Sequence, residues 1–326
     1  MKKSLFVGCL IFLIAGCGTK STTTAVNPDS PAQTAQQSKE SAKTSSAAQS
    51  NVELLNAGTE PKQQLRLAPL ANAKQTVEMT MKMDMAMSVA GQQQQAIATP
   101  PIKMTMDSNV TKVDANGDIH ANFSYVDADI VAAANTPPEM VNAMRSQIKK
   151  IVGLKGSMIV DNQGNTKQVN VDVPEDLDPN TKRMADQMVS SFKQISSPVP
   201  VEAVGVGAKW RVPNSVTANG MNLNQIATYE LVDLKDNVAT LQVSMEQQAE
   251  GQQINPPGLP EGASINLKSL KSEGKGKVKM ALNKMMPTSS NMSVRSNTEM
   301  TVKEAGSQQE TPMGMNSAME INLESK

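Results

Sequence analysis

The sequence predicts an α+β, β-rich fold: a large antiparallel sheet, either open or curled into a half-open barrel, with two amphipathic helices covering one face. Three observations lead to this fold class. Long stretches alternate strictly between apolar and polar residues, as the strands of a half-buried sheet do. Turn residues such as Asn, Asp and Gly separate these stretches at hairpin spacing. Two further segments repeat their apolar residues at the helical period, and helices between antiparallel hairpins are typical of α+β domains.

The longest alternating stretch is VEMTMKMDMAMSV, residues 77–89. Residues two apart in a strand point to the same side of the sheet, so its methionines share one face and its polar residues share the other. The apolar face consists of Met79, Met81, Met83, Met85 and Met87. A second alternating stretch at 102–113 carries Met104 and Met106, and we expect it to be the hairpin partner of the first.

The other strands follow from the same signals. The turn sequence DANGD joins residues 102–113 to the next stretch, and Asn162-Gln163-Gly164-Asn165 marks another hairpin. Alternation predicts that 156–173 and 228–247 each form a hairpin, and it predicts further strands at 119–125, 264–282, 290–304 and 315–324.

The two helices are each predicted from a start signal and an apolar stripe. The first begins at Thr136-Pro137-Pro138-Glu139 and ends at Gly153, and the second begins at Asp178-Pro179. The stripe of the first contains Met140, Met144, Ile148, Ile151 and Val152. The stripe of the second contains Met184, Met188, Phe192 and Ile195. Because each stripe occupies one side of its helix, both helices are expected to cover the sheet.

The N-terminus resembles the signal sequence of bacterial lipoproteins. Lys2 and Lys3 precede an apolar run that is too short to span a bilayer as a mature helix. The run ends in Ile14-Ala15-Gly16-Cys17, which is similar to a lipobox. The resemblance implies that residues 1–16 are removed and that Cys17 receives a lipid anchor, which makes the membrane a partner of the chain. The alternative is an ordinary secretory signal with an incidental cysteine.

The mature chain is expected to divide into a tether and a domain. Residues 17–62 are rich in Ser, Thr, Ala and Gln and have few large apolar side chains, so they predict a disordered tether. Residues 63–326 are expected to form one β-rich envelope domain. In enteric bacteria an Asp after the lipidated Cys retains a lipoprotein in the inner membrane. Gly18 therefore favours the outer membrane if the cell is Gram-negative.

Composition argues against several function classes. Basic and acidic residues balance at 31 each, and no basic patch contains aromatic residues, so nucleic-acid binding is not expected. Aromatic residues make up 2% of the chain, too few for the girdles of a transmembrane barrel. Cys9 lies in the segment expected to be removed and Cys17 would be blocked by lipid, which excludes disulfides and thiolate chemistry.

No catalytic motif is found, so we expect a protein that is not an enzyme and uses no cofactor. The single histidine, His120, alternates with apolar residues in a strand and is predicted to face solvent. An acidic cluster offers oxygen ligands to Ca²⁺, but it precedes the second predicted helix, where carboxylates favour the helix dipole. The cluster consists of Asp172, Glu175, Asp176 and Asp178. We expect no metal at these residues.

A family resemblance extends the lipoprotein interpretation. The segments PVPVEAVGVGAKWRV (198–212) and TYELVDLKDNVATLQV (228–243), with LKGSMIVDNQGN (154–165) upstream, resemble an uncharacterised family of bacterial lipoproteins. The resemblance implies fold and envelope location only, with Trp210 as a packing anchor at the start of a strand. By architecture, the expected fold is also similar to the half-barrel carriers of lipoproteins, although fold alone does not decide function.

The methionine-rich strands give the candidate site, and three interpretations of them stay open. The residues concerned are Met79, Met81, Met83, Met85, Met87, Met104 and Met106. They are a packed core, in which each buried Met contributes about 1.5–3 kcal/mol; an adaptable lining for a lipid or acyl chain; or a Cu(I) site, since thioethers select soft metals. Our specific expectation is a membrane-anchored, non-enzymatic lipoprotein that binds a hydrophobic ligand on a concave face. A structural or interaction lipoprotein and a copper-binding protein are the alternatives, and the sequence indicates no protein partner.

Overall fold

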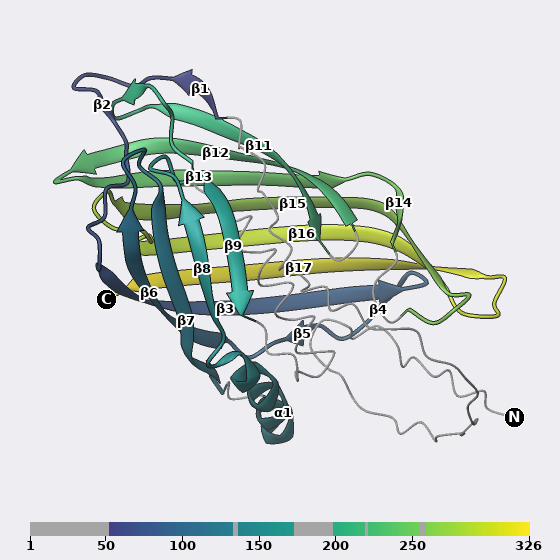
Figure 1. The fold of residues 1–326 in the computed structure, drawn as a ribbon. Coiled ribbons are helices and arrows are strands. Elements are labelled where there is room, and N and C mark those ends of the chain that lie inside the picture. Colours follow the sequence, from purple (N-terminus) through teal and green to yellow (C-terminus); the bar gives the residue numbers. More distant parts are fainter. Residues whose placement is uncertain (1–51, 133–135, 173–197, 219–220, 255–258) are drawn as a thin grey trace, which may run out of the picture. The chain divides into compact units, whose positions relative to one another are not determined.

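The computed structural model describes residues 52–132, 136–172, 198–218, 221–254 and 259–326 (Figure 1). All of them belong to one compact unit, Ser46–Lys326. Most strands join one 15-stranded antiparallel sheet, while β2 (Gln63–Gln64) and β10 (Ala203–Val204) form a separate pair. The main path of the sheet has the order β1 (Glu53–Asn56), β11 (Lys209–Ala218), β12 (Met221–Lys235), β13 (Val238–Ala249), β15 (Ser264–Ala281), β16 (Ser289–Lys303), β17 (Glu310–Ser325), β3 (Lys74–Val89), β6 (Ile102–Val113), β7 (Ile119–Ile130), β8 (Lys155–Val160) and β9 (Thr166–Asp172). The short strands β4 (Gln92–Gln93) and β5 (Ile97–Ala98) pair with β3, and β14 (Gln252–Ile254) pairs with β15.

Strand β3 joins the two halves of the sheet. It pairs with β6 over Lys74–Met81 and with the last strand, β17, over Val77–Val89. The expected pairing with the 102–113 stretch is therefore confirmed, with Met79 opposite Met104. The second partner is the C-terminal strand, more than two hundred residues away in the sequence.

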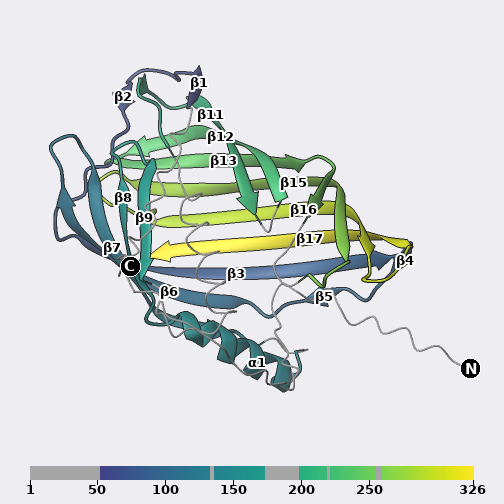
Figure 2. The same cartoon turned by 45° about the vertical axis from the view of Figure 1, so that its right-hand side comes forward.

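The sheet folds over itself at this junction. In both views β6–β9 turn steeply away from the long strands and stand across one end of them (Figures 1 and 2). Val110 of β6 and Ile119 of β7 share a buried cluster with Leu231, Leu241 and Val278 of the long strands. The face that carries these side chains thus lies inside the fold on both halves, and we call it the inner face. Within the described residues the edge strands β1 and β9 do not pair, so the sheet is not closed into a barrel.

The alternating sequence explains which face turns inward. In β15, Lys275 and Lys277 are exposed on the outer face, whereas Val278 and Met280 are buried on the inner face. Successive strand residues point to opposite faces, so one strictly alternating stretch provides a solvated side and a packed side. The observed strands and their alternating burial confirm the large antiparallel sheet that the alternating sequence predicted.

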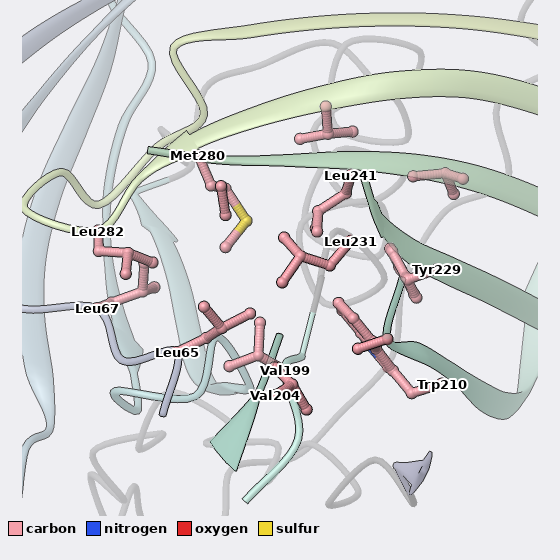
Figure 3. Packing of buried hydrophobic residues seen from close by; sticks show 14 of the residues in the cluster. Leu65, Leu67, Val199, Val204, Trp210, Tyr229, Leu231, Leu241, Met280 and Leu282 are labelled. Atoms are coloured by element: carbon pink, nitrogen blue, oxygen red, sulfur yellow. The ribbon is translucent and has the colours of Figure 1, made fainter. Parts of the chain in front are cut away.

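The largest buried cluster fills the end of the sheet where it folds over (Figure 3). Leu65 precedes β3 and Val199 precedes β11, and both insert among inner-face side chains of β12, β13 and β15. Trp210 is fully buried there; its indole Nε1 donates a hydrogen bond to the Pro198 carbonyl at 2.9 Å. Its ring also stacks on Tyr229 with centroids 5.6 Å apart. The predicted role of Trp210 as a packing anchor is confirmed.

The first predicted helix is confirmed, and part of its predicted apolar stripe is exposed. It forms α1 (Pro138–Ile148), followed by the 3-10 turn η1 (Lys149–Ile151). Val141 and Ile151 are buried, whereas Met140 is 47% exposed. In the predicted stripe Ile151 is buried and Met144 and Ile148 are half-buried, so the prediction was wrong only for Met140 and Val152. The helix lies chiefly against β7, where Arg145 reaches Asp129 at 2.6 Å and fixes its orientation.

The expectation of two helices over one face of the sheet is not confirmed. Among the described residues α1 is the one α-helix, and its main contacts are with β7 rather than with the long strands. The second predicted helix, from Asp178-Pro179 through Met184, Met188, Phe192 and Ile195, lies outside the described residues. In the part of the chain that the structure describes, no helix has the length and apolar character needed to cross a membrane.

Strand β1 lies within the range predicted as a tether, 17–62. It pairs with β11, and the Gly205 amide donates to the Ala57 carbonyl at 2.9 Å. The folded unit therefore includes residues from 52 onward, about ten residues earlier than the boundary expected from composition.

Candidate functional site

The methionines singled out in the sequence lie together on the inner face. The alternating methionines of β3 are all half-buried, as is Met104, whereas Met106 is buried with 7% of its surface exposed. Strand β17 extends the same surface with its own alternating apolar residues. We define the methionine face as the inner-face side chains Met79, Met81, Met83, Met85, Met87, Met313, Met315, Met319, Ile321 and Leu323.

The register between β3 and β17 places thioethers opposite one another. Met87 lies opposite Met315, and Met83 lies opposite Met319. Side chains in such cross-strand pairs have Cβ atoms about 4.5–5.5 Å apart and therefore touch. The β17 methionines were missed as part of the candidate site. Their alternation is visible in the sequence, but the pairing of the last strand with β3 is not.

Burial changes gradually across the inner face. Leu231 of β12 and Leu241 of β13 are fully buried, because the segments before β3 and β11 cover them. No side chain of the methionine face is fully buried, although the methionine face belongs to the same inner face of the sheet. The face is thus an extension of the core that the described parts of the chain cover incompletely.

Charge is confined to the opposite face of these strands. On β3, Lys82 and Asp84 lie 3.3 Å apart on the outer face, and Lys326 and Lys103 both contact Glu78 there. Hydrogen bonds from Lys326 and then Lys103 hold the pKa of the Glu78 carboxyl below its usual range. In the described strands β3, β12, β13, β15, β16 and β17, the inner-face positions carry no Asp, Glu, Lys or Arg.

A row of uncharged polar side chains crosses the inner face. Its members are register partners on successive strands: Gln225, Gln247, Ser272, Ser296 and Ser317. The Gln247 side-chain amide donates to the Gln225 carbonyl oxygen at 2.5 Å, and the hydroxyls of Ser272 and Ser296 lie 2.7 Å apart. The row ends at Met85 of β3, which lies opposite Ser317. We call it the polar row.

The outer face of β6–β9 carries the histidine and an open cavity. His120 is about a third exposed, and its Nε2 lies 2.7 Å from Asp114 Oδ2. Lys112 and then His120 lower the pKa of the Asp114 carboxyl by hydrogen bonding. A cavity of about 530 Å³ nearby is lined by polar side chains that include Thr76 and Asp107, themselves hydrogen-bonded at 2.6 Å.

The described residues bring together no recognisable metal site of the oxygen, nitrogen or thiolate type. Across the described ranges, no three or more side chains of His, Cys, Asp or Glu lie close enough to hold an ion. Of the acidic cluster considered for Ca²⁺, Asp172 lies at the end of β9, and Glu175, Asp176 and Asp178 lie outside the described residues.

Comparison with known proteins relates part of the chain to a protein family. No curated protein matches the chain. Residues 181–286, about a third of the chain, match the model of a family of unknown function (DUF6263). The matched range contains two of the three segments that carried the family resemblance, 198–212 and 228–243, whereas 154–165 lies outside it. In this region the chain is similar to an uncharacterised family.

Proposed function

We propose that this protein is a membrane-anchored, non-enzymatic lipoprotein of the cell envelope that binds a hydrophobic ligand, a lipid or an acyl chain, on the methionine face. One observation supports the proposal above the others. The apolar side chains of the methionine face on β3 and β17 stay half-buried, while Leu231 of β12 and Leu241 of β13 on the same inner face are fully buried. Apolar side chains that extend a core without full cover lose transfer free energy unless another molecule covers them.

The choice of side chain also favours a ligand. Methionine is unbranched and adapts its shape, and it is common at surfaces that accept varied apolar partners. On β15, Gly276 leaves room for a methionine to lie flat, because the Met292 sulfur stands 2.4 Å from the place where a Cβ would be. Methionine side chains that can change conformation above a glycine can adapt to acyl chains of different shape.

The anchor and the location complete the proposal. The lipobox-like residues before Cys17 support lipidation, and two or more acyl chains hold a protein firmly on a membrane. An anchored domain meets its ligand at the membrane surface, and Gly18 favours the outer membrane if the cell is Gram-negative. The uncharged inner face suits a ligand extracted from a bilayer.

A second candidate is Cu(I) binding, and the cross-strand methionine pairs favour it. Met87 lies opposite Met315 and Met83 lies opposite Met319 in the strand register, with Met85 between them on β3. Soft thioethers select Cu(I) over harder ions. The third possibility is a structural or interaction protein whose methionine face is covered by its own chain.

Native mass spectrometry of the full chain in an uncharged detergent tests these candidates together. We expect lipid to be retained by the wild type and lost in Met83→Asp, which places a charge on the methionine face where apolar contact is needed. Thr80→Asp, on the outer face of the same strand and beside Lys103 of β6, is the control and is expected to keep the lipid. A ligand-free mass that stays unchanged with added lipid and with added Cu(I) leaves only the structural role. Replacing the five β3 methionines with Leu separates the ligands, because Cu(I) binding is lost while lipid binding is kept.

A further inference from the structure

The polar row divides the apolar inner face into two parts. On one side the neighbouring inner-face residues include Met245, Val294 and Met319, and on the other they include Leu223, Leu270 and Met315. From Ser317 the inner-face residues of β17 extend for about 13 Å to Met313 and about 20 Å to Leu323, at roughly 3.3 Å per residue. The row itself crosses five strands and so is about 19 Å long at the usual strand spacing.

A polar row on such a surface carries a free-energy cost that its internal bonds only partly offset. Ser272 is 5% exposed, and its hydroxyl is satisfied by Ser296. After the Gln247–Gln225 hydrogen bond, each of the two amides still has an unused donor and acceptor by the capacity of the group. These remaining groups are uncharged and can both donate and accept, so they match an ester, an amide or a hydroxyl.

We infer that the ligand is an uncharged lipid of the acylglycerol class, whose ester or hydroxyl groups bond to the polar row while its hydrocarbon chains lie along the strands on either side. This inference rests on the proposed function and adds the chemistry of the ligand. An anionic headgroup at the same place would lose its hydration without meeting a cation, because the lysines and arginines of these strands are on the outer face. A hydrocarbon without polar groups would leave the row unpaired.

Another explanation of the row is register. Cross-strand polar pairs can fix the alignment of long strands whose apolar residues would otherwise tolerate a shift by two positions. In that case the row stabilises the sheet and has no effect on the choice of lipid. The two explanations give different results with lipids of different headgroup.

The test compares three probes that share an apolar character and differ in polarity. Dioleoylglycerol, dioleoylphosphatidate and the hydrocarbon squalane are offered in equal amounts to the full chain in an uncharged detergent, and the retained mass is measured. We expect at least a tenfold preference for dioleoylglycerol over each of the others. The row variants Gln225→Met with Gln247→Met, and Ser272→Ala with Ser296→Ala, remove both partners of each bond, so no buried group is left unpaired. Each is expected to weaken dioleoylglycerol binding about fivefold, the equivalent of one hydrogen bond, and to leave squalane unchanged.

The matched control lies on the outer face of the same hairpin. Asn297 of β16 donates to Asn316 of β17 at 2.8 Å, and the variant Asn297→Ala with Asn316→Ala is expected to keep the full preference. The inference is overturned if the wild type retains dioleoylglycerol and dioleoylphosphatidate equally, or if the row variants keep the preference for dioleoylglycerol. In either case, retention of squalane still supports the proposed function. Retention of none of the three probes overturns the proposed function as well. Should a row variant not fold, as judged by circular dichroism, the wild-type comparison decides alone.

Discussion

Tyr125 is the residue whose ionisation the fold alters most clearly. It lies on β7 among Phe123, Ile151 and Met158, with 8% of its surface exposed. Burial disfavours the charged phenolate, and it raises the pKa of Tyr125 to about 12. An unfolded tyrosine titrates near 10, so the folded and unfolded states hold different numbers of protons between these two pH values.

This difference predicts a loss of stability in alkali. Between about pH 10 and 12 the unfolded state releases the phenolic proton while the folded state keeps it, so the free energy of unfolding falls as the pH rises. The full effect is about 2–3 kcal/mol, at roughly 1.4 kcal/mol per pKa unit, and it is absent below about pH 9. Urea unfolding of the wild type and of Tyr125→Phe over this range measures it. The wild type should lose more stability than Tyr125→Phe; parallel curves for the two proteins contradict the prediction.

The methionines are also understood at the scale of single residues. Their class and their alternation were readable from the sequence, and so was the face on which the β3 methionines lie. Their half-buried state was not readable, because it depends on how far the segments around Leu65 and Val199 reach across the inner face. The burial of a strand residue depends on which other segments cover it, and the sequence pattern of the strand itself does not contain that information.

At the scale of elements, β15 packs against β16 with a glycine, Gly276, at the contact. A Cβ at Gly276 would stand 2.0 Å from the backbone oxygen of Asn291 and 2.4 Å from the Met292 sulfur. The backbone oxygen cannot move without parting the two strands. Gly276 is therefore required by close approach rather than by its backbone dihedral angle.

Gly276→Ala is expected to lower the free energy of unfolding by about 1–3 kcal/mol, the usual cost of overpacking. The control is Gly251→Ala, between β13 and β14, where the nearest atom to an added Cβ is the Leu267 oxygen at 3.6 Å. That substitution is expected to be neutral or to stabilise by up to about 1 kcal/mol, because alanine restricts the unfolded chain. The urea midpoints of the two variants compare their stabilities. Equal midpoints would show that β15 and β16 can move apart to admit the methyl group at little cost.

The elements show where reasoning from sequence succeeds and where it stops. Alternation predicted β3, β6, β15 and β16 closely, because period-two patterning is a local property. The apolar stripe of α1 was predicted correctly at Met144 and Ile148 but not at Met140, because the cover of a residue at the edge of a stripe depends on how the helix lies against β7. The polar row was overlooked for a related reason. Each member interrupts the apolar face of one strand, but their alignment into a row depends on the register between strands.

At the scale of the whole molecule, the described unit is held together by contacts between distant parts of the sequence. β3 near the start pairs with β17 at the end, and β1 pairs with β11 in the middle. Such pairings close long loops and fix the sheet order, and single-sequence patterns do not specify them. They also hold the described residues together in one compact unit, which leaves the first part of the chain as the candidate for attachment.

Attachment through Cys17 gives the last prediction. Metabolic labelling with radioactive palmitate should label the wild type and place it in the membrane fraction, because the resemblance to a lipobox implies acylation at Cys17. Cys17→Ser removes the acceptor thiol and should abolish the label. Cys9→Ser is the matched control: it lies in the same apolar run but in the segment expected to be removed, so labelling and fractionation should match the wild type. An unlabelled wild type, or a Cys17→Ser protein that still takes up palmitate, would rule out the anchor. The proposed hydrophobic ligand would then have to reach the methionine face from solution, since a released domain has no fixed contact with a bilayer.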